Sequence, residues 1–482
     1  MRQEIPAEQR LAGQWADSPP GQQIVTSDGT VLRVRYPGRL NPESGPDFLG
    51  AVLETDSGEV RGAVELHRRT SDWERHGHGA DPRYGDVVLH IVGRDDGAVS
   101  LLPGGGQLPL AELSEDGGVA WDGEPRFPCA VQMRGDRRSA LRVLSSAGEA
   151  RFQAMVTRLR HDLATVRPDP QGQEQVVYAE IASGLGYSRN EHAMRELAGI
   201  LPLCKARALS RQSNPVVRLE SAYLGSAGLL PSARHLPAGR RHDPYVQALE
   251  AMWCSQRDDR AMRAFQWDFT HVRPENAPVR RIVGLAHLAH SWPVGGLLPV
   301  VREALQRESK EPAHRRLAPL VSVGCPSGYW ERHWDFGVRA KGEAEALIDG
   351  ASGRGIAALI GPSRAADIVV NTLLPVLIAL GQLEDDTTLV ERAWECYRAH
   401  PLLSENWITR LVRQRSGLQH LRENTSGDSA IMSAFARARI QQGLIAVYEQ
   451  TCHALDCARC LLADVKNGTD PPLPLGATAD GG

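Results

Sequence analysis

Apolar and polar residues form strand-like patterns along much of the first hundred residues of the chain. The four clearest runs and one weaker run cover residues 30–38, 48–55, 60–68, 86–93 and 100–105. Clusters of glycine, aspartate and serine between the runs supply the turns. Polar residues interrupt the pattern at residues 73–84, which predicts a short helix or loop between the third and fourth strands. The segment therefore predicts a small sheet of four strands with a weaker fifth.

From about residue 137 onward, apolar residues recur every three or four positions, which is the spacing of an amphipathic helix. The clearest helical runs cover residues 140–163, 174–187, 194–203, 281–292 and 300–309. The composition of residues 114–128 predicts a linker, and that of residues 467–482 predicts a disordered tail. We therefore expect an α+β protein, with a small mixed sheet in residues 1–128 and a large all-α domain in residues 129–466.

Length and composition favour a globular protein without a membrane span. The 482 residues are 42% hydrophobic and 23% charged, which is enough chain for two or three domains. The longest apolar stretch, residues 368–380, contains Asn371, Thr372 and Pro375 and therefore favours a buried helix. The first 15 residues lack the apolar segment of a secretory signal. We expect a cytoplasmic protein whose cysteines are reduced or metal-bound rather than joined in disulfides.

Charge is distributed unevenly along the chain, whose net charge is only −3. Residues 1–129 carry 12 arginines and 21 acidic residues, and residues 130–340 carry 30 basic and 20 acidic residues. An acidic segment beside a basic one suits a metal site next to a phosphate-binding surface, so we expect nucleic acid as a partner. The predicted phosphate contacts are Arg273, Arg280 and Arg281, which precede an apolar helix; the alternative is a helix N-terminus held by salt bridges. No phosphate-binding glycine loop follows a strand, so we expect no nucleotide cofactor.

Acidic residues and histidines crowd into the segment between Gly45 and Val92. The potential ligands are Asp47, Glu65, His67, Asp72, His76, His78, Asp81 and His90. Each of them alone has a structural role available, such as a turn cap, a salt bridge or a hydrogen-bonded core histidine. Brought together in a small sheet, they could hold a divalent metal ion against a phosphate. Their crowding makes a metal-dependent hydrolase the leading hypothesis.

Several longer motifs resemble a bacterial family of domains of unknown function. In the N-terminal part they are GPDFLGAV (residues 45–52), GAVELH (62–67) and SDWERHGHGADPRYGDVVLHIV (71–92). Further along they are LGYSRNEHAMRELAGILP (185–202), LGSAGLLP (224–231), RPENAPVRRIVGLAHL (273–288), GYWERHWDFG (328–337), IVVNTLLPVLIALG (368–381) and the cysteine cluster at 452–460. The resemblance covers almost the full length but implies no function.

The N-terminal motifs also resemble nucleases of the PD-(D/E)xK type, which have a restriction-endonuclease-like fold. Pro46-Asp47 opens one predicted strand, and Glu65 and His67 share one face of the next strand. The resemblance implies that Asp47 and Glu65 bind Mg²⁺ or Mn²⁺. His67 stands where the family has lysine and would orient or deprotonate the attacking water. The remaining candidates, His76, His78, Asp81 and His90, would support this site.

Two alternatives to such a nuclease stay open. His76, His78 and Asp81 form a compact His-x-His-x-x-Asp set that suits Zn²⁺, Mn²⁺ or Fe²⁺ and loosely resembles metallo-β-lactamase hydrolases. In the other alternative the chain is a non-catalytic scaffold that binds nucleic acid or protein, and the same residues are structural.

A second metal site is predicted near the C-terminus, where Cys452, Cys457 and Cys460 lie within nine residues. In a reducing compartment such a cluster indicates metal ligands rather than disulfides. Zn²⁺ and iron–sulfur clusters both need four ligands, and iron–sulfur clusters accompany some nucleases of the PD-(D/E)xK type. Candidates for the fourth ligand are, in order, Cys396, Cys325 and His453. A closed site of this kind would hold the C-terminal helices in place.

Overall fold

The structure is a computed structural model. It describes residues 7–16, 18, 21–41, 45–56, 58–113, 129, 137–256, 260–269, 276–326, 328–339, 358–418, 433–454 and 457–463. The chain divides into two compact units. The sheet unit comprises Met1–Ala140, Leu411–Thr425 and Val447–Thr469, and the helical unit comprises Leu141–Arg410, Ser426–Ala446 and Asp470–Gly482.

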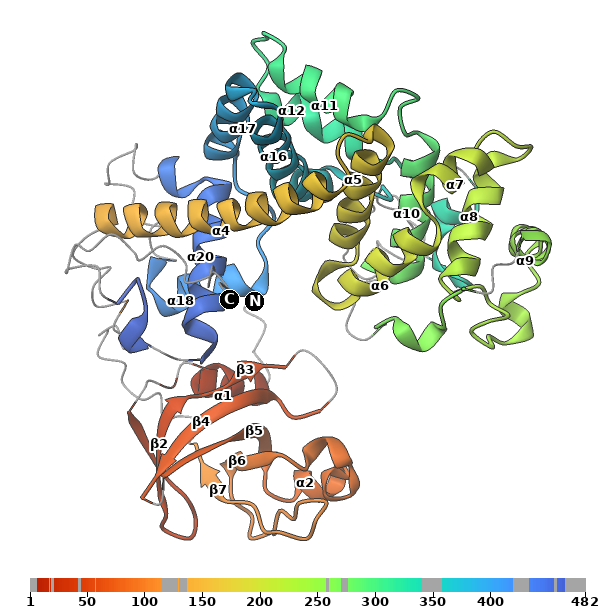
Figure 1. Cartoon of the computed structure of the whole chain (residues 1–482). Helices are drawn as coiled ribbons and strands as arrows, with labels where there is room; N and C mark the ends of the chain where they lie inside the picture. Colours follow the sequence, from red (N-terminus) through yellow and green to blue (C-terminus); the bar gives the residue numbers. More distant parts are fainter. Residues whose placement is uncertain are drawn as a thin grey trace, which may run out of the picture. The chain divides into compact units, whose positions relative to one another are not determined.

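One mixed sheet, seven-stranded in the described residues, forms the centre of the sheet unit (Figure 1). Its strands are β1 (Gln22–Val25), β2 (Val31–Tyr36), β3 (Arg39–Leu40), β4 (Phe48–Thr55), β5 (Gly58–Arg69), β6 (Val87–Arg94) and β7 (Leu110–Glu112). They follow the order β1-β2-β4-β5-β6-β7, and β3 pairs with β4. Neighbours are antiparallel from β1 to β5, whereas β5, β6 and β7 run parallel.

The four predicted strands are present as β2, β4, β5 and β6. The weaker fifth prediction is wrong, because residues 100–105 contribute only an isolated bridge between Leu101 and Gln107. A tight turn replaces the strand: the Leu102 N–H donates to the Gly106 carbonyl oxygen, and the Gly105 N–H donates to the Leu102 carbonyl oxygen, both at 2.8 Å. Together with the helical unit, the mixed sheet confirms the α+β class.

Strand alternation gives β5 and β6 two different faces. One face belongs to an apolar core with Leu11 and Trp15 of helix α1 (Ala7–Ala16). The strand residues in that core include Val64, Leu66, Leu89 and Ile91. The other face carries Glu65 and His67 on β5 and, opposite Glu65 in the parallel register, His90 on β6. Chemistry-bearing side chains therefore share one face of the sheet and are held there by the apolar face behind them.

The connection from β5 to β6 covers this polar face. It consists of α2 (Asp72–Arg75) and the short helices η1 (His78–Ala80) and η2 (Pro82–Tyr84), which confirms the short helix or loop predicted there. Trp73 and Tyr84 from this connection are buried, and a small apolar cluster joins them with Ala63, Val87 and Leu108. Packing against the sheet is thus the role of both aromatic side chains in the structure.

The helical unit contains most of the α-helices (Figure 1). From the amino-terminal side they are α4 (Arg137–Thr165), which begins in the sheet unit, α5 (Pro170–Leu185), α6 (Tyr187–Ile200), α7 (Leu203–Leu209), α8 (Pro215–Ser226), α9 (Pro244–Gln256), α10 (Pro278–His290) and α11 (Leu297–Gln306). Further along are α12 (Ala313–Leu317), α13 (Tyr329–Arg332), α15 (Pro362–Ile368), α16 (Leu374–Glu384) and α17 (Thr387–Ala399). A short hairpin of β8 (His333–Asp335) and β9 (Val338–Arg339) follows α13.

The long apolar stretch lies in the core of the helical unit. α15 continues through a π-helical turn, η7 (Val369–Leu373), into α16. The combined segment, Pro362–Glu384, has the length and composition to cross a membrane, but 72% of its apolar window is buried inside the protein. Burial of this kind is typical of a core helix and agrees with the prediction for residues 368–380.

The division into units differs from the predicted domains in one respect. The first boundary falls at Ala140, close to the predicted position after residue 128, but two later segments return to the sheet unit. Two further helices, α18 (Trp407–Arg415) and α20 (Ala438–Gln450), each contain such a boundary. The predicted linker at 114–128 and tail at 467–482 lie outside the described residues.

Candidate metal centre

The antiparallel pairing of β4 and β5 brings Asp47 next to Glu65. Phe48 pairs with Val64, so the residue before β4 lies opposite Glu65. The Asp47 N–H donates to Glu65 Oε2 at 2.9 Å, and the Leu66 N–H donates to Asp47 Oδ2 at 2.9 Å. Each carboxylate is therefore oriented by a backbone N–H group of the other residue's segment. Glu65 Oε1 takes no part in these two hydrogen bonds.

Glu65 Oε1 points into a cluster of three imidazoles. It lies 3.5 Å from His67 Nε2 and 3.2 Å from His78 Nε2. The same His67 nitrogen lies 3.3 Å from His78 Nε2 and 3.1 Å from His76 Nδ1. In the part of the chain that the structure describes, the three histidines form the one group of at least three ligand atoms close enough to share a metal ion.

These distances match the edges of a metal coordination shell. Ligand atoms 2.0–2.1 Å from a tetrahedral Zn²⁺ are about 3.3–3.4 Å apart, and the four measured edges run from 3.1 to 3.5 Å. A single imidazole nitrogen offers one in-plane position, either one proton or one lone pair. His67 Nε2 has three polar neighbours, and one hydrogen bond can join it to only one of them. A cation placed among the three imidazole nitrogens, which lie within 4.8 Å of one another, would meet all three at once, with Glu65 Oε1 beside two of them.

A glycine between His76 and His78 makes the convergence possible. His76 follows α2 directly, His78 opens η1, and Gly77 between them has a φ of +76°. This left-handed conformation reverses the chain locally, and glycine adopts it without steric cost. The Tyr84 ring then stacks on His78 with 3.9 Å between centroids, and Trp73 meets the His67 ring edge-on. Aromatic packing therefore fixes the orientation of the imidazoles.

A buried chain of hydrogen bonds extends from the far side of His67. Its Nδ1 lies 2.9 Å from His90 Nε2, and His90 Nδ1 lies 2.7 Å from Ser100 Oγ. If His67 Nε2 binds a metal ion, its Nδ1 carries the proton and donates to His90, whose own Nδ1–H donates to Ser100. Such outer hydrogen bonds set the tautomer and the orientation of a metal-binding imidazole. His90 thus contacts the cluster through His67, and Ser100, which no sequence pattern singled out, contacts His90 in turn.

Burial keeps the histidines of the cluster neutral. It lowers the pKa of His67 to about 2 and the pKa values of His78 and His90 to about 4, and neighbouring histidines add to each shift. At pH 7 all three are therefore neutral imidazoles, the form that binds a metal ion. His67 is only 2% exposed, whereas His76 is exposed and marks the side from which solvent reaches the cluster.

Asp81 does not belong to the cluster, so the His-x-His-x-x-Asp ligand set is wrong at its third member. The Asp81 carboxylate accepts hydrogen bonds from the Arg83 backbone N–H at 3.0 Å and from the Arg83 guanidinium. These bonds lower the pKa of Asp81 to about 2. Asp81 caps η2, and the carboxylate that reaches the imidazoles is that of Glu65.

The arginines predicted to bind nucleic acid have another role in the structure. Arg280 is fully buried; its guanidinium donates to the carbonyl oxygens of Trp330 at 3.0 Å and His333 at 3.2 Å. Arg281 is buried as well and donates to the Leu359 carbonyl oxygen. Both hold α10 to neighbouring segments, so their assignment as phosphate contacts is wrong. Arg273 lies outside the described residues.

The structure contradicts one part of the predicted C-terminal metal site, namely Cys396 as its fourth ligand. Cys396, the preferred fourth ligand, belongs to the helical unit and packs in its apolar core, where burial raises the pKa of its thiol to about 12. A neutral core thiol is a poor metal ligand. Cys452, Cys457 and Cys460 lie in the sheet unit, but their sulfurs are not among the ligand atoms that the described residues bring within 4.8 Å of one another.

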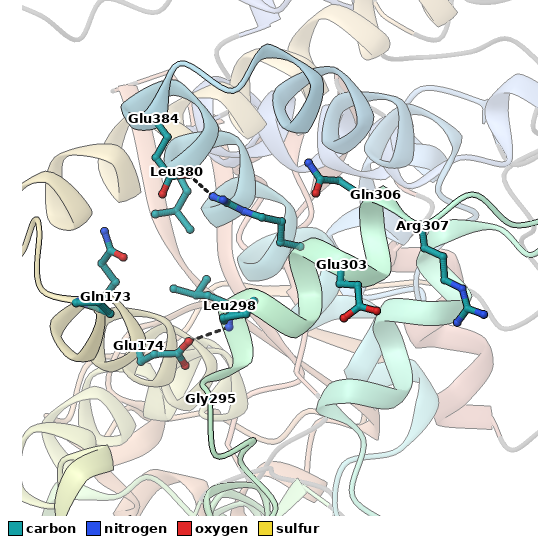
Figure 2. A pocket seen from close by; sticks show the side chains of 12 residues that line it. Gln173, Glu174, Gly295, Leu298, Glu303, Gln306, Arg307, Leu380 and Glu384 are labelled. Atoms are coloured by element: carbon teal, nitrogen blue, oxygen red, sulfur yellow. Dashed lines mark hydrogen bonds and ion pairs between the residues drawn. The ribbon is translucent and has the colours of Figure 1, made fainter.

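A separate hollow of about 640 Å³ lies in the helical unit between α5, α11 and α16 (Figure 2). Glu174 closes one end of it by accepting hydrogen bonds at 2.8 Å from the Leu297 and Leu298 N–H groups at the start of α11. Arg302 pairs with Glu384 on its wall. Because the α11 N-terminus already holds the protein's own carboxylate, this hollow gives no sign of a ligand.

No curated protein matches the chain, and no solved structure matches it either. The model of one protein family does match, over residues 15–406, and its description is "Protein of unknown function (DUF2851)". The matched region contains every member of the histidine cluster and most of both units. The chain therefore belongs to the DUF2851 family of proteins of unknown function.

Proposed function

We propose that the protein is a metal-dependent phosphodiesterase that cleaves nucleic acid at the histidine cluster. The observation that carries the proposal is the convergence of one nitrogen each of His67, His76 and His78, with Glu65 Oε1 3.2–3.5 Å from two of these nitrogens. Three imidazoles and one carboxylate suit Mn²⁺, Zn²⁺ or Fe²⁺ better than Mg²⁺. The proposed ion thereby changes from Mg²⁺ or Mn²⁺ to Mn²⁺, Zn²⁺ or Fe²⁺.

Each residue of the site has a defined part in such a reaction. A bound ion would lower the pKa of a coordinated water and stabilise charge on the phosphate. His67, His76 and His78 would hold the ion. Glu65 would either complete the shell or accept the proton of the water, since its Oε1 lies within 3.2–3.5 Å of two ligand nitrogens. Asp47 would keep Glu65 in place through the two reciprocal backbone hydrogen bonds.

Arginines near the cluster support a phosphate-containing substrate. Arg69 at the end of β5 and Arg75 at the end of α2 are both exposed, and the charge of Arg75 acts on His67. Guanidinium groups bind phosphate oxygens through paired, charge-assisted hydrogen bonds. With Arg280 and Arg281 buried in α10, the phosphate contacts of the proposal lie at the sheet instead.

The test combines metal replacement with cleavage assays. Protein freed of metal by chelation is reloaded with Mn²⁺, Zn²⁺ or Mg²⁺ and incubated with labelled single- and double-stranded DNA and RNA. We expect cleavage with Mn²⁺ or Zn²⁺ and little with Mg²⁺. His76→Ala should reduce it by more than about 100-fold, beyond what a change outside the coordination shell costs. His290→Ala, an exposed histidine of α10, is the matched control and should leave cleavage unchanged.

One observation favours a second candidate, a structural metal site. Glu65 Oε1 lies beside two of the three histidines and would close the shell if it also bound the ion, and closed four-ligand sites are structural in most proteins. In that case His76→Ala would abolish metal binding and lower the melting temperature, and the metal-loaded natural protein would cleave none of the substrates. Cleavage by the natural protein that is lost in His76→Ala would exclude the structural role alone.

A further inference from the structure

Four of the eight cysteines gather in the sheet unit although they come from opposite ends of the chain. They are Cys129 and the C-terminal group Cys452, Cys457 and Cys460, whereas the other four cysteines belong to the helical unit. None of the eight forms a disulfide, and all lie in the described part of the chain. The fold thus places Cys129 in the same unit as the three cysteines of the C-terminal group.

Arg415 connects the two groups directly. The Cys129 thiol lies 3.7 Å from the Arg415 carbonyl oxygen. The Arg415 Nη1 in turn lies 3.0 Å from Cys452 Sγ and 3.0 Å from the Cys452 carbonyl oxygen. Arg415 is itself buried, with its guanidinium 4.3 Å from the centre of the Tyr36 ring. Cys129 and Cys452 therefore contact the same buried residue.

The other two cysteines lie at the two ends of one short helical turn. Cys457 opens the short helix η10 (Cys457–Arg459), and the Cys460 N–H donates to the Cys457 carbonyl oxygen at 3.3 Å. A Cys-x-x-Cys segment in a tight turn is the usual way in which two ligands of a thiolate site are provided. Cys460 is buried and Cys457 is half-buried, so both thiols are shielded at least in part from solvent.

We propose that Cys129, Cys452, Cys457 and Cys460 form a four-thiolate metal site, with Cys129 as the ligand that the C-terminal motif lacks. Four thiolates give such a site a net negative charge, and the Arg415 guanidinium beside Cys452 would offset part of it. The site needs no activity at the histidine cluster, so it stands independently of the proposed function. It would tie the C-terminal segment to the sheet unit.

The spacing of the sulfurs bears on which metal the site takes. Sulfurs around a single Zn²⁺ are about 3.8 Å apart, because Zn–S bonds are about 2.3 Å long. No three ligand atoms of the four cysteines lie within 4.8 Å of one another in the described residues. An iron–sulfur cluster places several metal atoms between its thiolates and so accepts a wider spacing. Zinc would require the four sulfurs to move closer together, and metal analysis distinguishes the two occupants.

Metal analysis of the full-length protein tests the site. The protein is purified anaerobically with the His76→Ala substitution, so that the histidine cluster does not contribute, and is analysed for iron, zinc and acid-labile sulfide. We expect about two or four iron atoms with as many sulfides, or about one zinc, per chain. Adding Cys129→Ser should remove most of this metal, while adding Cys396→Ser or Cys204→Ser should leave it unchanged. Full metal content after Cys129→Ser would overturn the assignment of Cys129.

A measurement without cysteine variants covers the case in which Cys129→Ser does not fold. Thiol reagent is added to the native protein before and after strong chelation, and the modified cysteines are identified by mass spectrometry. We expect Cys129, Cys452, Cys457 and Cys460 to become reactive together, in step with metal release. A protein that carries no metal after anaerobic purification, or whose four thiols react independently of the chelator, would refute the site.

Discussion

In the metal-bound tautomer His67 Nδ1 carries a proton, and replacing His90 with leucine would leave this N–H buried without an acceptor. Both side chains are at most 2% exposed, so water cannot replace the bond. An unsatisfied buried donor costs about 1–3 kcal/mol, and loss of an outer-shell partner lowers metal affinity about 10–100-fold, which is about 1.4–2.7 kcal/mol. The two free-energy ranges, for the unsatisfied donor and for the lost metal affinity, overlap. We therefore expect His90→Leu to weaken Mn²⁺ or Zn²⁺ binding by one to two orders of magnitude.

The affinity is measured by competition with a chelating dye, on the natural protein and on three variants. Ser100→Ala removes only the next bond along the chain, 2.7 Å from His90 Nδ1, and should cost about tenfold or less. His90→Gln keeps an acceptor oxygen near His67 and should recover part of the loss. An affinity in His90→Leu equal to that of the natural protein would refute the idea that His67 binds metal through Nε2 with its tautomer set by His90.

Three further predictions follow from packing and electrostatics. Gly62→Ala should lower the free energy of unfolding by about 1–3 kcal/mol in chemical denaturation, because a Cβ would lie 2.4 Å from the Asp86 carbonyl oxygen; an unchanged midpoint would contradict the close β5–β6 approach. Arg280→Met should lower the melting temperature yet leave nucleic-acid affinity in a filter-binding assay unchanged, and weaker binding by a folded variant would contradict the structural role of Arg280. Burial lowers the pKa of His400 to about 4, so the unfolded chain takes up its proton below pH 6.5 while the folded protein does not. Stability should therefore fall as the pH drops from 6.5 toward 4, and His400→Gln should lose about 2 kcal/mol less than the natural protein between pH 7 and pH 5; equal losses would contradict the neutral buried state.

Local patterns predicted the parts of the site that depend on neighbouring residues. The alternation at Glu65 and His67 puts both on one face of β5, and the same rule applied to β6 selects His90. The pairing of β4 with β5 placed Asp47 beside Glu65, as the strand order indicated. Side chains alternate between the two faces of a strand, so the sequence alone is sufficient to assign these residues to one face.

Features that depend on distant contacts were not predictable in this way. Arg280 and Arg281 resemble an exposed basic patch, and only the tertiary structure shows the backbone carbonyl groups that bind them. Ser100 follows β6 in an irregular segment where no periodicity indicates its direction. Cys129 shares the sheet unit with the C-terminal cysteines because the chain returns to that unit after the helical unit, and this return leaves no local pattern.

The protonation of the histidine cluster determines how its close nitrogen–nitrogen contacts are accommodated. Imidazole nitrogens 3.1 and 3.3 Å from His67 Nε2 would direct lone pairs at one another unless a proton or a metal ion lies between them. Burial disfavours additional protons on the cluster at neutral pH, since it lowers the pKa of His67 to about 2 and that of His78 to about 4. The neutral tautomers leave one proton for each contact, for example from His78 Nε2 to Glu65 Oε1 and from His76 Nδ1 to His67 Nε2. A divalent ion bound by the three imidazoles would replace the protons on these ring nitrogens, and its positive charge would compensate the buried Glu65 carboxylate, which is the arrangement that the proposed function requires.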